Sequence, residues 1–213
     1  MGYGLWVMDT RTLVAAYRGG DATAGNALFE MLRPWLRMLA GSEALGRFGA
    51  KFDRDDLVQQ TLLEATRGFP QFRGDTEPEL LGWVRQILAR VVAHEIRRFQ
   101  GTQKRDIDLE VSLDQSLSAS AGRLGDMLAG SGTSPGTRMD RREREVALAR
   151  VLERLPEDYR TVLVLRHLEG LSHEEIARRM GRGAGSVRML WARALGRLRE
   201  ELIQDGGLGT ETG

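Results

Sequence analysis

Apolar residues recur three or four positions apart along most of the chain. This is the spacing of one face of an α-helix, and no stretch shows the strict alternation of apolar and polar residues that is typical of a half-buried strand. The pattern therefore predicts an all-α protein. The expected helices are Arg11–Arg18, Asp21–Leu39, Arg54–Gly68, Pro78–Gln100, Arg141–Arg154, Glu157–Glu169, His173–Met180 and Gly185–Leu202.

The helical pattern stops between residues 101 and 140, where Gly, Ser, Thr and Asp cluster. Such a composition is typical of a linker. About forty residues are too many for an ordinary loop inside a compact domain, so the segment either separates two domains or runs along a partner. We expect two small helical domains, 1–100 and 141–203, joined by a long flexible linker at 101–140 and followed by a disordered tail at 204–213.

Short sequence signals mark several helix ends. Pro156 lacks a backbone N–H and disfavours a helical residue before it, so it separates two of the expected helices. In "GLSHEE", Gly170 suits the left-handed conformation that ends a helix, and Ser172 with Glu175 forms a capping box. The next helix is expected to begin at that box and to end at Gly181.

The two helices around "MGRGAGSVR" have the pattern of a helix-turn-helix unit. The first is short, and the second carries an apolar stripe at i, i+3, i+4 and i+7. The stripe consists of Val187, Leu190, Trp191, Ala194, Leu195, Leu198 and Leu202. The opposite face, here called the cationic face, consists of Ser186, Arg188, Met189, Ala192, Arg193, Gly196 and Arg197.

Charge is unevenly distributed along the chain, although 31 Lys and Arg nearly balance 30 Asp and Glu. Residues 178–199 contain seven arginines and no acidic residue. Arginines on a narrow helix face can contact phosphates or the guanine edge in the major groove of DNA, so the pattern favours DNA binding. The alternative is a solvated helix face without a ligand.

Catalytic, metal and cofactor sites are not expected. A nucleotide-binding glycine loop needs a preceding strand or a following Gly-Lys pair, and the glycines at 181, 183 and 185 have neither. "SHEEIA" and "AHEIRR" lack the second histidine of a zinc-binding HExxH motif, and the chain contains no cysteine. The sequence also has no signal peptide and no apolar run near the ~20 residues of a membrane span. We therefore expect a cytoplasmic protein without membrane insertion.

Two helices of the N-terminal half carry further candidate surfaces. In residues 54–68 one face is apolar and the other is acidic and polar, which suits either solvent or a docking partner. The apolar residues expected to pack are Leu57, Leu62, Leu63 and Ala65. In residues 78–100 aromatic residues alternate with arginines, as in surfaces that stack unpaired bases. Composition alone favours Trp83 and Ile87 as simple core residues.

In combination, "DDLVQQTLLEA", "WVRQILAR" and "LPEDYRTVLVLRHLEGLSHEEIARRMGRGAGSVRMLWARALGRLR" resemble the sigma factors of bacterial RNA polymerase. The resemblance is to the extracytoplasmic-function (ECF) group of the sigma-70 family. It covers about residues 11–100 and 141–203. It implies a region 2-like helical bundle, a region 4-like helix-turn-helix domain, and three partners: the clamp and flap of core RNA polymerase, promoter DNA, and an anti-sigma factor.

The resemblance also implies roles for individual residues. Core polymerase binding falls on the helix at 53–67, with Asp56, Gln59, Gln60 and Leu63 as candidates. Recognition and melting of the minus-ten element fall on 70–98, with Phe72, Trp83, Arg90, His94, Arg97 and Arg98 as candidates. Recognition of the minus-thirty-five element falls on 172–199, with Ser186, Arg188, Met189, Ala192, Arg193 and Arg197 as candidates.

The chain departs from the family pattern at several of these positions. Arg90 stands where Asn is common and His94 where Asp is usual, so the minus-ten base preference does not transfer. Gly183, Met189 and Leu190 also depart from the family pattern, which leaves the minus-thirty-five sequence open. Two alternatives remain at this point: a stand-alone helix-turn-helix regulator, and a decoy that binds polymerase or an anti-sigma factor.

Overall fold

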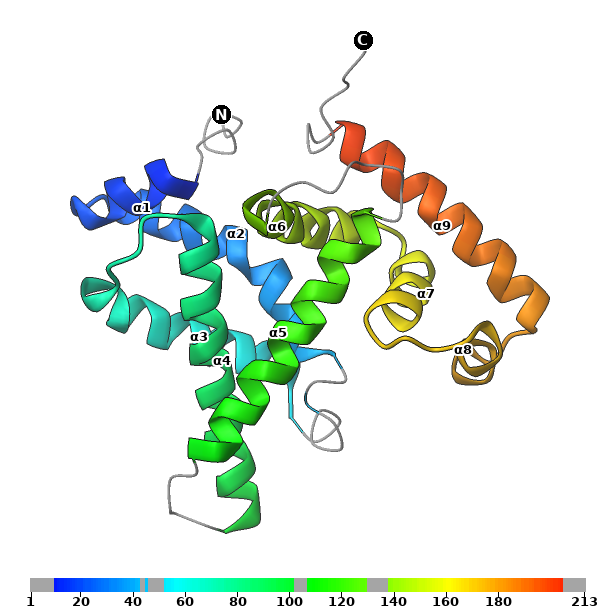
Figure 1. Cartoon of the computed structure of the whole chain (residues 1–213), viewed down its shortest axis with the longest axis horizontal. Helices are drawn as coiled ribbons and strands as arrows, with labels where there is room; N and C mark the ends of the chain where they lie inside the picture. Colours follow the sequence, from blue (N-terminus) through cyan, green and yellow to red (C-terminus); the bar gives the residue numbers. More distant parts are fainter. Residues whose placement is uncertain (1–9, 43–44, 46–51, 102–106, 130–137, 205–213) are drawn as a thin grey trace. The chain divides into compact units, whose positions relative to one another are not determined.

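The computed structural model describes residues 10–42, 45, 52–101, 107–129 and 138–204. Every element in these ranges is a helix, which confirms the all-α fold (Figure 1). The helices are α1 Thr10–Arg18, α2 Ala22–Ala40, α3 Arg54–Gly68, the 3-10 turn η2 Phe69–Gln71, α4 Glu77–Gln100, α5 Ile107–Ala129, α6 Arg138–Arg154, α7 Glu157–His167, α8 His173–Met180 and α9 Ala184–Gln204. Eight of them coincide with the expected helices to within three residues at each end.

Side-chain caps explain where the helices of the N-terminal half begin. The carboxylate of Asp21 accepts hydrogen bonds from two backbone N–H groups at the start of α2, and Asp53 does the same for α3. α4 begins with a reciprocal capping box between Thr76 and Glu79. It ends at Gly101, which adopts the left-handed conformation with φ 70°.

Contacts divide the chain into two units, Met1–Ala119 and Ser120–Gly213. In the first unit α1 packs on α2, α2 on α3, and α3 on α4. The two helices α1 and α2 approach closely at Gly25, where an added Cβ would clash with the ring of Tyr17. The largest fully buried side chains of these four helices are Trp35, Leu28, Leu32, Leu36, Leu39, Leu80, Leu81, Leu88 and Ile96.

In the second unit α9 contacts each of α6, α7 and α8. The apolar side chains that α9 contributes to this core are Val187, Ala194, Leu198 and Leu202, all of which are buried. They meet a core that includes Leu148, Val162, Leu163, Leu168 and Ile176. α9 is therefore the helix around which the second unit is assembled.

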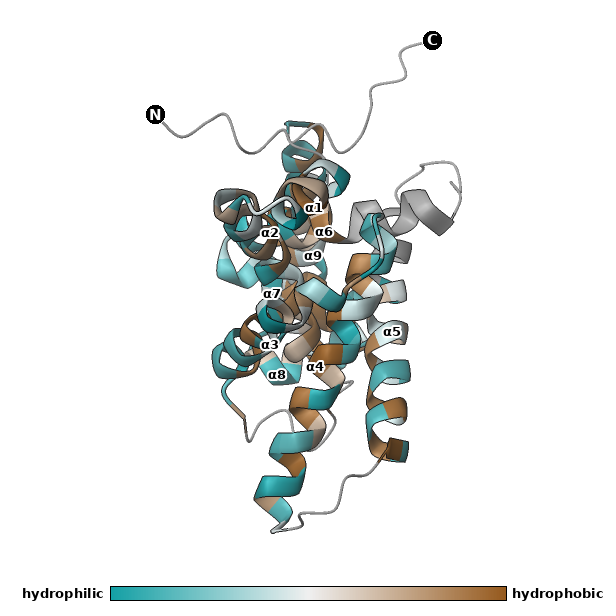
Figure 2. Cartoon of the chain, turned by 90° about the vertical axis from the view of Figure 1, so that its left-hand side faces the viewer, coloured by the Kyte–Doolittle hydropathy of each residue, from teal (hydrophilic) through white to brown (hydrophobic). Residues whose placement is uncertain are grey.

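The expected linker without regular structure is wrong for residues 107–129, which form α5. Leu113, Leu117 and Ala121 are buried and lie four residues apart, so α5 has an apolar stripe of its own. Figure 2 shows hydrophobic positions recurring along α5 between hydrophilic ones. The Ser and Gly content of this segment hid a helical period that was present in the sequence. Residues 102–106, 130–137 and the expected tail at 205–213 lie outside the described residues.

Two ion pairs join the first turns of α5 to α4. The Nε of Arg85 lies 2.8 Å from Oδ1 of Asp114, and Nη1 of Arg97 lies 3.4 Å from Oε1 of Glu110. The side chains of Arg97 and Glu110 are only 14% and 11% exposed. Solvent screens partly buried pairs of this kind less than fully exposed pairs, so they help to hold α5 in place.

Replacing Leu117 by Ala tests whether α5 is packed in solution. Leu117 is fully buried, and truncation of such a side chain lowers the free energy of unfolding by about 2–5 kcal/mol. The matched control is Gln115→Ala on the exposed side of the same helix, which should change it by less than about 0.5 kcal/mol. Urea unfolding followed by circular dichroism measures both. Equal values for the two variants would show that α5 is not docked.

Candidate nucleic-acid interface

The turn between α8 and α9 is built by backbone hydrogen bonds rather than around a ligand. Gly181 ends α8 with φ 64°, in the left-handed region, as expected. The N–H of Arg182 then donates to the carbonyl of Ala177 at 2.9 Å. Gly183 caps α9 without a side chain, since the N–H of Val187 donates to its carbonyl at 3.0 Å. The glycines therefore shape a tight helix-turn-helix connection.

The start of α8 has the expected capping box. The N–H of Ser172 donates to Oε2 of Glu175 at 2.8 Å, and the N–H of Glu175 donates to Oγ of Ser172 at 3.2 Å. The hydrogen bond from the Ser172 hydroxyl, followed by that from its backbone N–H, lowers the pKa of Glu175. The first turn of the helix is thus held by a carboxylate in its charged form.

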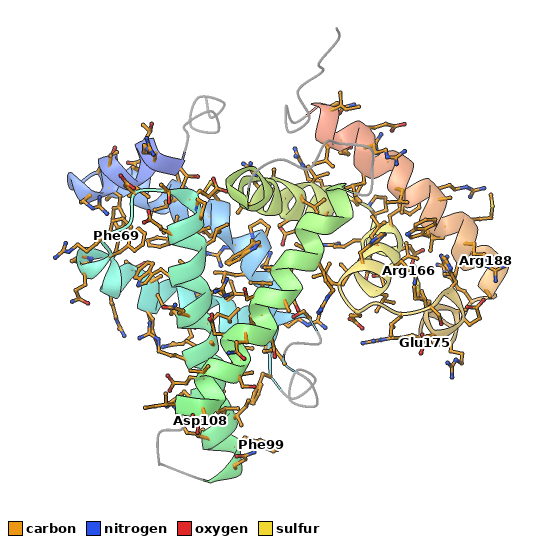
Figure 3. The ribbon with its side chains drawn as sticks, viewed as in Figure 1. Phe69, Phe99, Asp108, Arg166, Glu175 and Arg188 are labelled. Carbon is orange, nitrogen blue, oxygen red and sulfur yellow. The ribbon has the colours of Figure 1, made fainter. Side chains whose placement is uncertain are left out.

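The two faces of α9 differ in burial as the sequence pattern predicts. Four members of its apolar stripe are buried, and the other three, Leu190, Trp191 and Leu195, are half-buried. All seven residues of the cationic face are exposed. Figure 3 labels Arg188 near the N-terminal end of α9 and Glu175 on the neighbouring α8. The structure therefore brings together every candidate residue for reading a duplex on one open helix face.

The arginines of the cationic face are held to different degrees. Nη2 of Arg188 lies 2.8 Å from Oε1 of Glu174 on α8. Arg197 pairs within its own helix with Glu200 at 3.2 Å and Glu201 at 2.6 Å. Arg193 has no ion pair or hydrogen bond to any residue in the described ranges. Sequence inspection missed Glu174, because its contact with Arg188 depends on how the turn places the two helices.

An aromatic cluster underlies the minus-ten candidates. Phe72 is only 6% exposed and stacks on the half-buried Trp83, with ring centroids 4.8 Å apart. Phe69, labelled in Figure 3, touches both rings as well as Tyr17. Nη2 of Arg18 donates to the carbonyl of Phe72 at 3.2 Å and to that of Gly74 at 2.8 Å, which holds the loop before α4. Trp83 thus lies partly in the core, as expected, and stays partly exposed.

The arginine and histidine candidates for the minus-ten element lie farther along α4. Arg90, His94 and Arg98 are exposed. Arg97 shares their side of the helix by spacing, but its guanidinium is held by Glu110 of α5. Glu95 contacts both His94, at 3.3 Å, and Arg98, at 3.1 Å. The structure therefore leaves these two side chains and Arg90 exposed, and it holds Arg97 in a partly buried ion pair.

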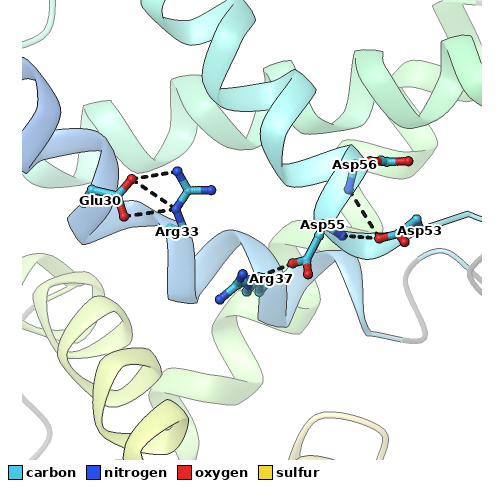
Figure 4. A network of polar contacts seen from close by, with 6 residues as sticks. All are labelled: Glu30, Arg33, Arg37, Asp53, Asp55 and Asp56. Atoms are coloured by element: carbon cyan, nitrogen blue, oxygen red, sulfur yellow. Dashed lines mark hydrogen bonds and ion pairs between the residues drawn. The ribbon is translucent and has the colours of Figure 1, made fainter.

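The four core-polymerase candidates Asp56, Gln59, Gln60 and Leu63 are all exposed on α3. Leu63 was also expected to pack, and this is wrong because its side chain is 43% exposed. The start of α3 is anchored to α2 by an ion pair between Arg37 Nε and Asp55 Oδ1 at 2.8 Å (Figure 4). The N–H groups of Asp55 and Asp56 donate to the carboxylate of Asp53 in the same view. The exposed side chain of Leu63 thus stands among the acidic and amide side chains of Asp56, Gln59 and Gln60.

Comparison with known proteins bears on both units. A model of the family "Sigma-70, region 4" matches residues 145–198. The ECF RNA polymerase sigma factor SigD of Mycobacterium bovis is 30% identical over 199 residues, which cover 91% of this chain and 84% of that protein. The chain belongs to the ECF RNA polymerase sigma factors. The sigma-E factor of Escherichia coli K12 is similar at 29% identity over 181 residues, covering 85% of this chain and 87% of that protein.

Two solved structures were also matched by this ECF sigma factor. One is the RsbN–BldN complex, with 19% identity, a TM-score of 0.31, and coverage of 88% of this chain and 97% of that one. The other is the sigma factor RpoE with the anti-sigma factor NepR from Bartonella quintana, with 21% identity, a TM-score of 0.28, and coverage of 81% and 92%.

The length of the match with SigD distinguishes the sigma-factor interpretation from that of a stand-alone helix-turn-helix regulator. The similarity to SigD runs over nine-tenths of the chain, so it includes the first unit as well as the helix-turn-helix. The sigma-factor interpretation is therefore confirmed over a stand-alone regulator. Within the described residues there is no group of three or more His, Cys, Asp or Glu side chains arranged to hold a metal ion. In the same ranges no helix is long and apolar enough to cross a membrane.

The side chain of His167 on α7 contacts Trp191 on α9. The indole N–H of Trp191 donates to Nε2 of His167 at 3.2 Å, and the two rings are stacked. Burial lowers the pKa of His167, and the charge of Arg166 lowers it further. His173 meets the same indole edge-on. The neutral imidazole is therefore the form that accepts the Trp191 hydrogen bond.

This arrangement predicts a pH dependence of stability. Because the pKa of His167 is lower in the folded than in the unfolded chain, the unfolded chain takes up the proton first as the pH falls below about 6.5. The free energy of unfolding should therefore be highest above that pH and decrease toward pH 5. Urea midpoints at pH 7.5 and 5.5 measure the effect, and His167→Gln should reduce the difference. His94→Gln, which removes an exposed imidazole, is the control; equal slopes in wild type and His167→Gln would refute the assignment.

Proposed function

We propose that this ECF sigma factor binds core RNA polymerase in the cytoplasm and directs it to promoters, itself catalysing no reaction. The observation that carries the proposal is the cationic face of α9, which is exposed along its whole length while the opposite stripe is buried or half-buried. A helix presented in this way after a tight turn is the element that enters the major groove in helix-turn-helix proteins. We infer that it contacts the minus-thirty-five element.

Two kinds of contact are expected on that face. Arg188, Ser186 and Met189 lie within its first turns, near the end that reaches base edges in such proteins. Arg193 and Arg197 lie farther along, where arginines meet phosphates. Phosphate contacts supply affinity that depends on salt, and base contacts supply sequence choice.

For the minus-ten element we propose a surface formed by Trp83, Arg90, His94 and Arg98 of α4. These residues are spaced so that they share one side of the helix. Trp83 is half-buried with Phe72 stacked on its ring, and we infer that an extruded base packs against the part of the indole that stays exposed. The neighbouring guanidinium groups of Arg90 and Arg98 would neutralise phosphates of the single strand. Arg97 joins them when its pair with Glu110 opens.

For core polymerase we propose the exposed surface of α3 formed by Asp56, Gln59, Gln60 and Leu63. An apolar side chain surrounded by polar ones is typical of the centre of a protein interface. The cap by Asp53 and the ion pair between Arg37 and Asp55 hold this helix start in place before binding. The relatives are named for RNA polymerase, which supports this partner. An anti-sigma factor stays a predicted further partner.

Separate variants test the two surfaces. Arg188→Ala and Arg193→Ala should each weaken promoter binding by the holoenzyme by about tenfold, because each removes a contact worth about 1–3 kcal/mol or one phosphate charge. Leu63→Asp should instead weaken association with core enzyme by about tenfold or more, because it places a charge at the centre of the interface. Core binding is measured by pull-down and promoter binding by fluorescence anisotropy.

For the proposal to hold, the loss of promoter binding and the loss of association with core enzyme must arise from different variants. The arginine variants should retain wild-type association with core enzyme, and Gln115→Ala on α5 serves as an exposed control for both assays. If wild-type protein and core enzyme together start transcription from no genomic promoter, the proposed function fails.

A further inference from the structure

Of the three arginines on the cationic face, only Arg188 forms an ion pair with another helix in the described part of the chain. Its partner Glu174 is the second residue of α8, and Arg188 is the fifth residue of α9. Their side chains meet at 2.8 Å, directly across the glycine turn. Both side chains are about 60% exposed, so the pair lies at the surface that DNA would meet.

Glu174 is suited to remain charged in this position. Its own backbone N–H at the start of α8 lowers its pKa, and the hydrogen bond from Arg188 lowers it further. The capping box uses Glu175 and Ser172, so Glu174 is a first-turn carboxylate of α8 that lies outside the box. The box therefore stays complete when the contact of Glu174 with Arg188 is removed.

A held guanidinium and an unheld one are suited to different tasks. Reading a guanine needs two parallel N–H donors in a fixed direction, and Arg has five donors in a planar fork, so one can be held while others stay available. A phosphate oxygen accepts from many directions, so a mobile side chain serves equally well. Arg188 has the first arrangement, and Arg193 has the second.

We propose that Glu174 is a positioning residue for sequence discrimination: it orients Arg188 to read a guanine, while Arg193 supplies phosphate affinity. The inference rests on the proposed function, since it requires the cationic face to meet duplex DNA. It adds a residue outside α9 to the determinants of sequence choice.

The carboxylate should also have an opposite effect on affinity. A negative charge beside the phosphates is repulsive, and it neutralises part of the charge of Arg188. Removing it by Glu174→Gln should therefore raise affinity for an unrelated duplex and steepen the dependence of log K on log salt by up to about one. Discrimination should fall at the same time. A purely structural defect would lower both the affinity for an unrelated duplex and the sequence discrimination.

The experiment uses holoenzyme assembled from the full chain and core polymerase. A duplex library with ten randomised base pairs upstream of a constant minus-ten segment is selected by binding and sequenced. Wild type should enrich a guanine at one position that Arg188→Ala no longer distinguishes. Glu174→Gln should reduce the preference at that same position by about threefold to tenfold, less than the full value of a bidentate contact. Preferences elsewhere should be unchanged.

Glu200→Gln is the matched control, since it removes an exposed carboxylate from the pair with Arg197 and leaves Glu201 in place. The double variant Glu174→Gln with Arg188→Ala should show the same preferences as Arg188→Ala alone. If Glu174→Gln changes preferences in that background, Glu174 contacts the DNA itself and the positioning role is wrong.

Two failures remain distinguishable. If wild-type holoenzyme enriches no upstream sequence, duplex reading by α9 fails and the proposed function with it. If wild type enriches a sequence and Glu174→Gln enriches it equally strongly, only the role of Glu174 is refuted. Circular dichroism of each variant checks that the helices are retained.

Discussion

The burial of one stripe of α9 is the constraint on which the functional surface of the second unit depends. Val187, Ala194 and Leu198 are buried where α9 packs on α6, α7 and α8. Burial of a Val or Leu side chain contributes about 1.5–3 kcal/mol, and the single methyl group of Ala194 contributes about 0.8 kcal/mol. Because a helix has only one side opposite its buried stripe, this packing also decides which residues remain open. The arginines are thus exposed as a consequence of where the apolar residues go.

The ion pairs of this protein say more about its charged surfaces than its net charge does. A formal net charge of +1 gives no sign of a nucleic-acid partner, yet the structure separates held arginines from unheld ones. Arg97 is partly buried against Glu110, whereas Arg193 has no partner among the described residues. An exposed pair is weak in itself, so its main consequence is the direction in which the guanidinium points. Such ion pairs therefore influence which arginine side chains a ligand contacts first.

Most helices could be predicted because their signals are local. The capping box at Ser172 and Glu175, the left-handed Gly181 and the stripe of α9 each involve residues within a few positions of one another. α5 was missed for the opposite reason: Ser, Gly and Asp favour turns by composition, and this outweighed the four-residue spacing of Leu109, Leu113, Leu117 and Ala121. Its stability comes from packing and from the pairs with Arg85 and Arg97, which composition does not reveal.

The sequence by itself determined the helical class, the helix ends and the sidedness of α9, since periodicity and capping depend on neighbours along the chain. Only the tertiary structure decided that Leu63 is exposed, that Phe72 lies beneath Trp83, and that Glu174 faces Arg188. These depend on helices brought together from distant segments, and a side-chain contact of 2.8 Å depends on the angle between two helices. No local sequence pattern specifies the angle between two helices.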